Sequence, residues 1–146
     1  MKRFRFDLEK ILEIRAYRER EAEIELGRAV GALTAVEQQI KSVAASRSGA
    51  ASCRFAPGNG LDEIRRYDLY INRLDAERDR LLKEAAEAEL KVETARQTFL
   101  EASRERKVLD KLKEKRRREH RDALLSEETM ALDDIAGALA DRKAAL

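Results

Sequence analysis

A run of apolar and small residues, spaced alternately three and four apart, dominates the second half of this chain. Between Leu61 and about Arg121, one face of the expected helix carries Ile64, Tyr67, Ile71, Leu74, Leu81, Ala85, Ala88, Val92, Ala95, Phe99, Ala102 and Leu109. A seam that is sustained over several heptads indicates a coiled coil rather than a helix of a globular domain. Because a coiled coil leaves almost no room for an enclosed pocket, the pattern favours a protein that works by interaction.

The composition supports the same conclusion. Charged residues make up 41% of the 146 residues and aromatic residues only 5%, which is typical of long helices. The 31 basic and 29 acidic side chains nearly cancel, so the net charge identifies no partner. The start of the chain has no apolar core of signal-peptide length, and no apolar run approaches the roughly 20 residues of a membrane span. With one cysteine, Cys53, available, we expect a soluble protein of the cytoplasm.

A second seam occupies the first part of the chain, within residues 6–46. Its apolar positions are Ala22, Leu26, Ala29, Leu33, Val36, Ile40 and Val43. Upstream, Arg15 and Glu19 fall on the same seam, so we expect looser packing there. Gly27 and Gly31 lie beside the seam, where each costs about 1 kcal/mol relative to Ala. They are either tolerated glycines or a place where another backbone comes close.

The segment between the two seams is rich in Gly, Ser and Pro, which predicts a loop. Two helices with complementary seams joined by a loop form an antiparallel hairpin. We therefore predict an all-α fold, a long two-helix coiled-coil hairpin with unequal arms and a C-terminal helical extension, as a single domain over residues 1–146. The expected segments are a helix at about 6–46, a loop at 47–60, a second helix at about 61–121 or beyond, and an acidic amphipathic tail at 122–146.

The expected pairing of the arms follows from a fold-back near residue 54. It would place Leu33 near Asp75 and Leu8 near Leu100, and would leave the second helix without an intrachain partner beyond about Arg104. This overhang, Arg104 to Arg121, carries ten basic and four acidic residues. It is a solvated helix, a binding site for a protein with an acidic rim, or a nucleic-acid site. The interleaved carboxylates and the lack of aromatic residues disfavour nucleic acid.

The tail reverses the sign of the charge and regains an apolar stripe at Leu125, Leu132, Ile135 and Leu139. It continues the long helix, folds back as a third helix, or becomes ordered only on binding. At the other end of the chain, Phe4 and Phe6 either cap the hairpin against Phe99 or its neighbours or serve as exposed anchors. Tyr70 lies off the seam and is either a contact residue or a bystander.

Motifs for catalysis are absent from the sequence. There is no phosphate-binding loop of the Walker type. The single histidine, His120, lies among charged residues far from Cys53, so a zinc site is not expected. We expect a protein that is not an enzyme and binds no cofactor, metal or small-molecule substrate.

Three segments together resemble a known family. FRFDLEKILEIRAYREREAEIELGRAVGAL resembles the opening of FliJ-type flagellar export proteins, and GNGLDEIRRYDLYINRL resembles their hairpin tip and second-helix entry. RKVLDKLKEKRRREHRDALLSEETMALDDIA is similar to their C-terminal region, with LDDIA after a basic stretch. The segments occur in the family's order and cover nearly the whole chain.

The resemblance implies a non-enzymatic component of the flagellar type III export apparatus, similar in fold to the central stalk of rotary ATPases. It implies three kinds of partner: the export ATPase FliI, whose ring receives the end that carries both termini; the export-gate protein FlhA; and chaperones of late export substrates. The implied location is cytoplasmic, peripheral at the inner face of the cell membrane through the export apparatus alone.

The resemblance also implies site residues. Those facing the ATPase would be Phe4, Phe6, Leu8, Ile11, Lys111, Lys113, Lys115, Arg116, Arg117, Arg118 and Arg121. Those binding the export gate would be Gln39, Val43, Tyr70, Leu74 and Leu81. Three other functions stay open: the stalk protein of a virulence-type secretion system, a nucleic-acid-binding coiled coil that uses Arg116–Arg118, and a self-associating structural coiled coil.

Overall fold

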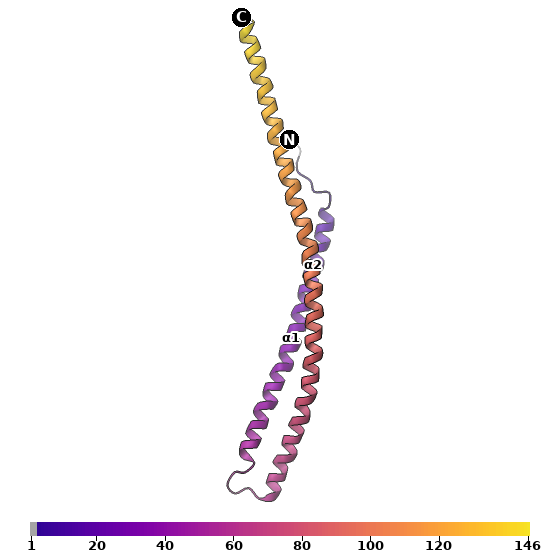
Figure 1. Ribbon diagram of the computed structural model, residues 1–146, viewed down its shortest axis with the longest axis vertical. Coiled ribbons are helices and arrows are strands. Elements are labelled where there is room, and N and C mark those ends of the chain that lie inside the picture. Colours follow the sequence, from indigo (N-terminus) through magenta and orange to yellow (C-terminus); the bar gives the residue numbers. More distant parts are fainter. Residues whose placement is uncertain (1–2) are drawn as a thin grey trace. The chain divides into compact units, whose positions relative to one another are not determined.

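Two long helices make up nearly all of the protein. The computed structural model describes residues 3–146, in which α1 (Glu9–Cys53) and α2 (Leu61–Ala144) run antiparallel and pack against each other (Figure 1). The predicted all-α hairpin with unequal arms is confirmed, since the helices have 45 and 84 residues. The described residues form two compact units: the hairpin body, residues 18–101, and the terminal unit, residues 3–17 with 102–146. The assignment of the whole chain to a single domain stays a prediction.

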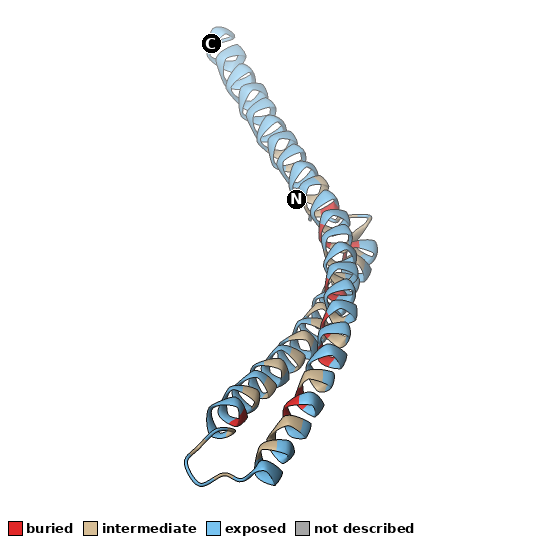
Figure 2. Cartoon of the chain, turned by 60° about the horizontal axis from the view of Figure 1, so that its bottom comes forward, coloured by how far each residue is buried: buried red, intermediate tan, exposed pale blue. Residues whose placement is uncertain are grey.

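The hairpin body is held together by the predicted seams. On α2, five seam residues are buried: Ile71, Leu74, Leu81, Ala85 and Val92. Leu81 is the most deeply buried of them, at 1% exposure. On α1, Ala22 and Ala50 are buried, and the seam residues between them are half-buried. Figure 2 shows these buried positions as narrow bands on otherwise exposed helices, which is the burial pattern of a two-stranded coiled coil.

Helix α1 ends later than the sequence predicts. We expected the loop to begin at residue 47, but α1 continues to Cys53, so the loop is residues 54–60. The seam explains the difference, because Ala50 is buried at the next seam position and Arg47 pairs with Asp75 on α2 (2.6 Å). These tertiary contacts outweigh the low helix propensity of Gly49 and its neighbouring serines.

The loop is closed by backbone contacts at both of its ends. Gly58 has a φ of 93°, in the left-handed region that glycine adopts without strain. The carbonyl oxygen of Cys53, which has no helical partner where α1 ends, accepts hydrogen bonds from the Asn59 side-chain amide (2.9 Å) and from the Ala56 N–H (3.1 Å). The Gly60 N–H donates to the Glu63 carboxylate (2.7 Å), which caps the start of α2.

The pairing of the arms in the hairpin body differs from the expected one. Arg47 pairs with Asp75, and Arg54 pairs with Asp68, each at 2.6 Å. The residue numbers of each pair add up to 122, whereas the expected approach of Leu33 to Asp75 implies 108. The expected pairing is therefore wrong by fourteen residues. Fourteen residues are two whole heptads, and such a shift leaves every seam position facing the other helix.

The same correction applies to the terminal unit. Lys113 forms an ion pair with Glu9 (2.8 Å), so Leu8 lies beside the turn of α2 that contains Lys113 and not beside Leu100. The expectation that α2 lacks a partner beyond Arg104 is wrong, because residues 3–17 pack along this part of the helix.

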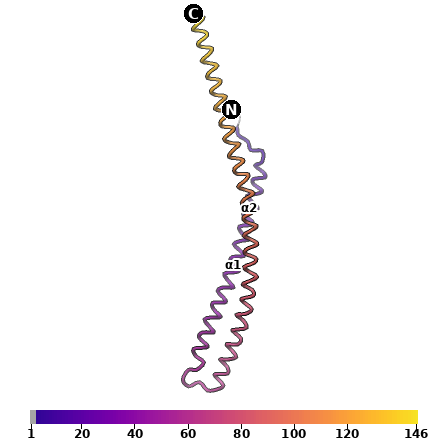
Figure 3. Tube along the Cα trace, viewed as in Figure 1, coloured from indigo at the N-terminus to yellow at the C-terminus, as the bar shows by residue number. Residues whose placement is uncertain are grey.

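Two open questions from the sequence are resolved by the backbone. Of the three possible paths of the tail, the structure has the continuous one: α2 runs to Ala144 without a break (Figure 3). A Cβ atom added at Gly27 or Gly31 would meet nothing within 4 Å. These are tolerated glycines, and no other backbone comes close to them.

Candidate interaction surface

An aromatic contact joins the N-terminal segment to the basic part of α2. The ring of Phe4 lies 5.6 Å from the ring of His120, at an interplanar angle of 34°. The Arg117 guanidinium lies 5.9 Å from the centre of the Phe4 ring, within the range of a cation–π interaction. Phe4 therefore caps the end of the helix pair, but against His120 rather than the expected region around Phe99.

Two polar contacts extend this packing within the terminal unit. Lys113 pairs with Glu9, and both side chains are partly shielded from solvent. Arg15, one of the two polar residues on the first seam, donates a hydrogen bond to the backbone carbonyl of Glu105 (3.0 Å). Leu109, in the same unit, is buried at 5% exposure. The terminal unit is thus held by a small apolar contact at Leu109 and by these polar contacts of charged side chains.

Two open grooves flank the N-terminal segment. One, of about 590 Å³, is lined by Arg116 and His120 among others. The other, of about 670 Å³, is lined by Lys113 and Arg117 among others. Both have walls that mix cations with carboxylates and are open to solvent, so they are suited to contact another surface rather than to enclose a small molecule.

The predicted ATPase-facing residues all lie in the terminal unit, as the resemblance requires. Phe4, Phe6 and Leu8, which belong to the N-terminal segment, are half-buried, whereas Ile11 is 43% exposed. The exposed cations of the set are Lys111, Lys115, Arg116, Arg117, Arg118 and Arg121. Lys113 is committed to its ion pair with Glu9.

The arginine triplet that a nucleic-acid site would use already has contacts within the chain. Arg117 lies over Phe4, Arg118 pairs with Glu114, and Arg116 lies 4.0 Å from Glu119. The two ion pairs partly offset the positive charge available to a phosphate backbone, and Phe4 covers Arg117, so the structure gives this alternative no support.

The predicted gate-binding residues lie in the hairpin body but differ in their accessibility. Gln39 and Tyr70 are exposed, and Val43 is half-buried. Leu74 (9% exposed) and Leu81 (1% exposed) belong to the packed seam. A partner could touch these two only if the two helices separated, and their assignment as gate-binding residues stays a prediction.

The exposed apolar residues near the loop were not identified from the sequence. Phe55, Leu61 and Leu69 are 68% to 70% exposed, and Tyr70 lines a groove of about 320 Å³ beside Tyr67. Heptad counting could have found Leu69, since it lies five residues after Ile64, on the side of α2 opposite the seam.

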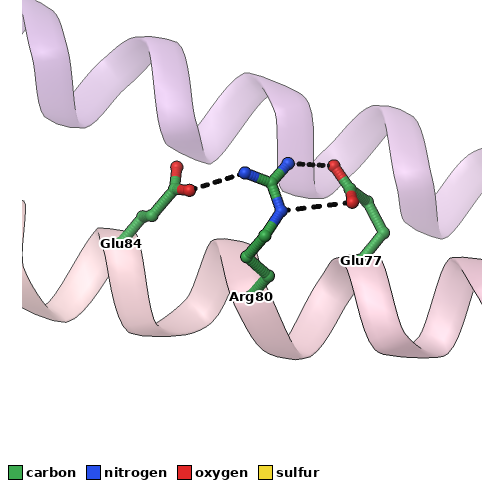
Figure 4. Close-up of polar contacts among 3 residues, drawn as sticks. All are labelled: Glu77, Arg80 and Glu84. Atoms are coloured by element: carbon green, nitrogen blue, oxygen red, sulfur yellow. Dashed lines mark hydrogen bonds and ion pairs between the residues drawn. The ribbon is translucent and has the colours of Figure 1, made fainter.

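Several other charged residues form solvent-exposed pairs along the helices. Figure 4 shows Arg80 between Glu77 and Glu84 on one face of α2. The hydrogen bond from Arg80, together with its positive charge, lowers the pKa of Glu77, and the same carboxylate raises the pKa of Arg80. Such exposed pairs contribute little to stability.

Residues 3–146 offer neither a metal site nor a membrane-spanning helix. There is no group of three or more His, Cys, Asp or Glu side chains that could hold a metal ion. Nor is any helix in this part of the chain both long enough and apolar enough to cross a membrane.

Comparison with known families identifies the chain. The sequence model described as "Flagellar FliJ protein" matches residues 4–145. The chain belongs to the FliJ family. No curated protein and no solved structure matches it. Membership in the FliJ family makes this a protein of flagellar export, in a family of non-enzymatic helical export components.

Proposed function

We propose that this FliJ-family protein is a stalk of the flagellar export apparatus, whose terminal unit binds in the ring of the export ATPase FliI and promotes the ring's assembly and activity. The observation that carries the proposal is the architecture of the terminal unit. Residues 3–17 pack on the basic part of α2, and beyond them the helix continues to Ala144 with its side chains exposed.

The unpaired end of α2 has suitable dimensions for this role. Residues 122–144 form a helix about 35 Å long at roughly 1.5 Å per residue. A single helix of this length with exposed leucines is poorly stabilised alone, because most helical stability in proteins comes from packing of an apolar face. A ring lumen would supply that packing.

A second contact, with the export gate FlhA, would use the hairpin body. Gln39 and Tyr70 are accessible for it, and exposed Leu69 adds apolar area next to Tyr70. Export chaperones would be further partners. With these contacts the protein works in the cytoplasm and reaches the inner face of the membrane only through the apparatus.

The test measures ATP hydrolysis and ring assembly by the cognate flagellar ATPase, with the full chain and with a variant lacking residues 126–146. This deletion leaves the contacts of Phe4, Glu9 and Leu109 in place, so the rest of the terminal unit stays folded. We expect the full chain to stimulate hydrolysis and ring formation, and the deletion variant to lose both effects.

The matched control is the double variant Leu69→Ala/Tyr70→Ala, which changes the hairpin body alone. It should stimulate the ATPase normally and bind FlhA less well. Equal stimulation by the full chain and the deletion variant would show that the tail is not the working end. Stimulation of a virulence-type ATPase, with none of the flagellar enzyme, would favour the virulence-type stalk instead.

A further inference from the structure

The end of α2 carries an apolar face that nothing in residues 3–146 covers. Four large side chains of this face are 55% to 66% exposed, and Figure 2 shows the whole end of the helix as exposed: Leu125, Leu132, Ile135 and Leu139. The side of α2 that packs against the N-terminal segment and the start of α1 is a different one. It includes Lys113 and His120, and at the following seven-residue intervals it is acidic, with Glu127, Asp134 and Asp141. Helix α1 therefore cannot cover the apolar face.

The heptad pattern of the tail is that of a two-stranded coiled coil. Leu125, Leu132 and Leu139 are seven residues apart and occupy position a. Position d is then occupied by Glu128, Ile135 and Arg142. The flanking positions e and g hold mostly small or apolar residues: Leu124, Thr129, Ala131, Ala136, Ala138 and Ala145. The core of such an interface is thus apolar except for one acidic and one basic residue at position d.

The two charged core residues distinguish between the possible orientations of a second copy of the chain. In a parallel dimer each residue faces its own equivalent, so Glu128 would lie against Glu128 and Arg142 against Arg142. In an antiparallel dimer, position a of one helix packs against position d of the other. If Leu132 faces Ile135 of the second copy, Glu128 comes close to Arg142 of that copy. The antiparallel dimer therefore replaces two repulsive contacts by two attractive ones.

The other charges of the tail fit the same antiparallel alignment. Asp122 and Lys143 both lie at position e, and the alignment places Asp122 of one copy beside Lys143 of the other. Residues 122–134 carry five acidic and no basic side chains, whereas residues 135–146 carry two basic and one acidic. Antiparallel pairing lays the second segment against the first, and parallel pairing would lay five carboxylates against five. Within residues 3–146, none of Asp122, Glu128, Arg142 and Lys143 has an ion-pair partner of its own.

We infer that two copies of this chain pair through residues 122–145 of α2, as an antiparallel coiled coil with two-fold symmetry. The paired region is about 36 Å long at roughly 1.5 Å per residue. It begins just beyond His120, where the contact with Phe4 lies, so the N-terminal segment and the second copy cover different parts of α2. The surface is self-complementary, as a two-fold dimer requires.

The pairing does not depend on the function proposed above, but it has a consequence for it. A second copy would cover the same apolar face that a ring lumen would pack against. The dimer would then be a closed form of the protein, and the ATPase ring and the second copy would compete for the tail.

The first experiment measures the mass of the full chain by sedimentation velocity over a series of concentrations. We expect a reversible equilibrium between monomer and dimer. Leu132→Ala/Ile135→Ala removes the central apolar contacts and should raise the dissociation constant of the dimer by about tenfold or more. The matched control, Leu82→Ala/Leu90→Ala, truncates two exposed leucines of the hairpin body and should leave the constant unchanged. Circular dichroism will verify that each variant keeps the native helix content.

The second experiment tests the orientation by reversing charges. Glu128→Arg alone, or Arg142→Glu alone, brings like charges together in the antiparallel dimer and should weaken it by about fivefold or more at low salt. The double variant Glu128→Arg/Arg142→Glu restores opposite charges and should recover the native dissociation constant. In a parallel dimer the single reversals would change nothing, because like charges face each other before and after the change.

Each other outcome counts against the inference. A native chain that stays monomeric up to about 1 mM would overturn it and leave the apolar face to the ATPase ring. A dimer that Leu132→Ala/Ile135→Ala does not weaken must form through another surface. Single charge reversals without effect, or a double variant that does not recover, would exclude the antiparallel pairing. The proposed function is tested separately: a chain that dimerises as expected and never stimulates the ATPase would overturn that proposal alone.

Discussion

Replacement of Leu81 by Ala tests whether the seam holds the hairpin body together. Leu81 is 1% exposed, the most buried large side chain of the described chain. Truncation of a buried Leu removes its transfer free energy and leaves a cavity, which costs about 2–5 kcal/mol in globular cores. A two-helix core is thin and water can enter the cavity, so we expect about 2–3 kcal/mol at the lower end of that range. For a chain of this length, that corresponds to a fall in melting temperature of roughly 5–10 °C.

The assay is urea unfolding followed by circular dichroism, with Leu90→Ala as the matched control. Leu90 lies on the same helix and is 70% exposed, so its truncation should change the free energy of unfolding by less than about 0.5 kcal/mol. Equal effects of the two substitutions would refute the burial of Leu81 and favour its predicted place on the gate-binding surface. A Leu81→Ala variant of native stability that no longer binds FlhA would have the same meaning.

Three further changes test other features of the structure. Gly31→Ala should stabilise the protein by about 0.5–1 kcal/mol, because a Cβ there meets nothing within 4 Å; a loss of stability in thermal unfolding would reveal a contact. Arg47→Glu should destabilise the hairpin by up to about 1 kcal/mol, and adding Asp75→Arg should restore most of it; failure of the double variant to recover would contradict the pairing of the arms. By carbon-detected NMR, the Glu77 carboxyl should titrate with a pKa below the ordinary value of glutamate, and Arg80→Ala should raise it. The ion pair's contribution to stability is present above the unfolded-state pKa of Glu77 and disappears as the pH falls through its lower folded-state pKa, so an unchanged titration in Arg80→Ala would exclude the pair.

The candidate surface could be predicted only in part from the sequence. The basic segment and the N-terminal phenylalanines were assigned to one working end, and the structure has them in one unit. The division of the cations between a covered and an exposed side could not be predicted without knowing what covers α2. Leu74 and Leu81 are expected both in the seam and on the gate-binding surface; the structure has them buried in the seam, and their role at the gate stays a prediction.

The sequence by itself determined which side of each helix is apolar, since a repeat of three and four residues defines one face of a helix regardless of what lies opposite. It thereby determined the all-α class, the hairpin and the seam. Only the tertiary structure decided the pairing of the two arms. A heptad seam looks the same after a shift of seven or fourteen residues, so many alignments bury the same residues. The choice among them depends on where α1 ends and on single pairs such as Arg47 with Asp75, which no periodic pattern specifies.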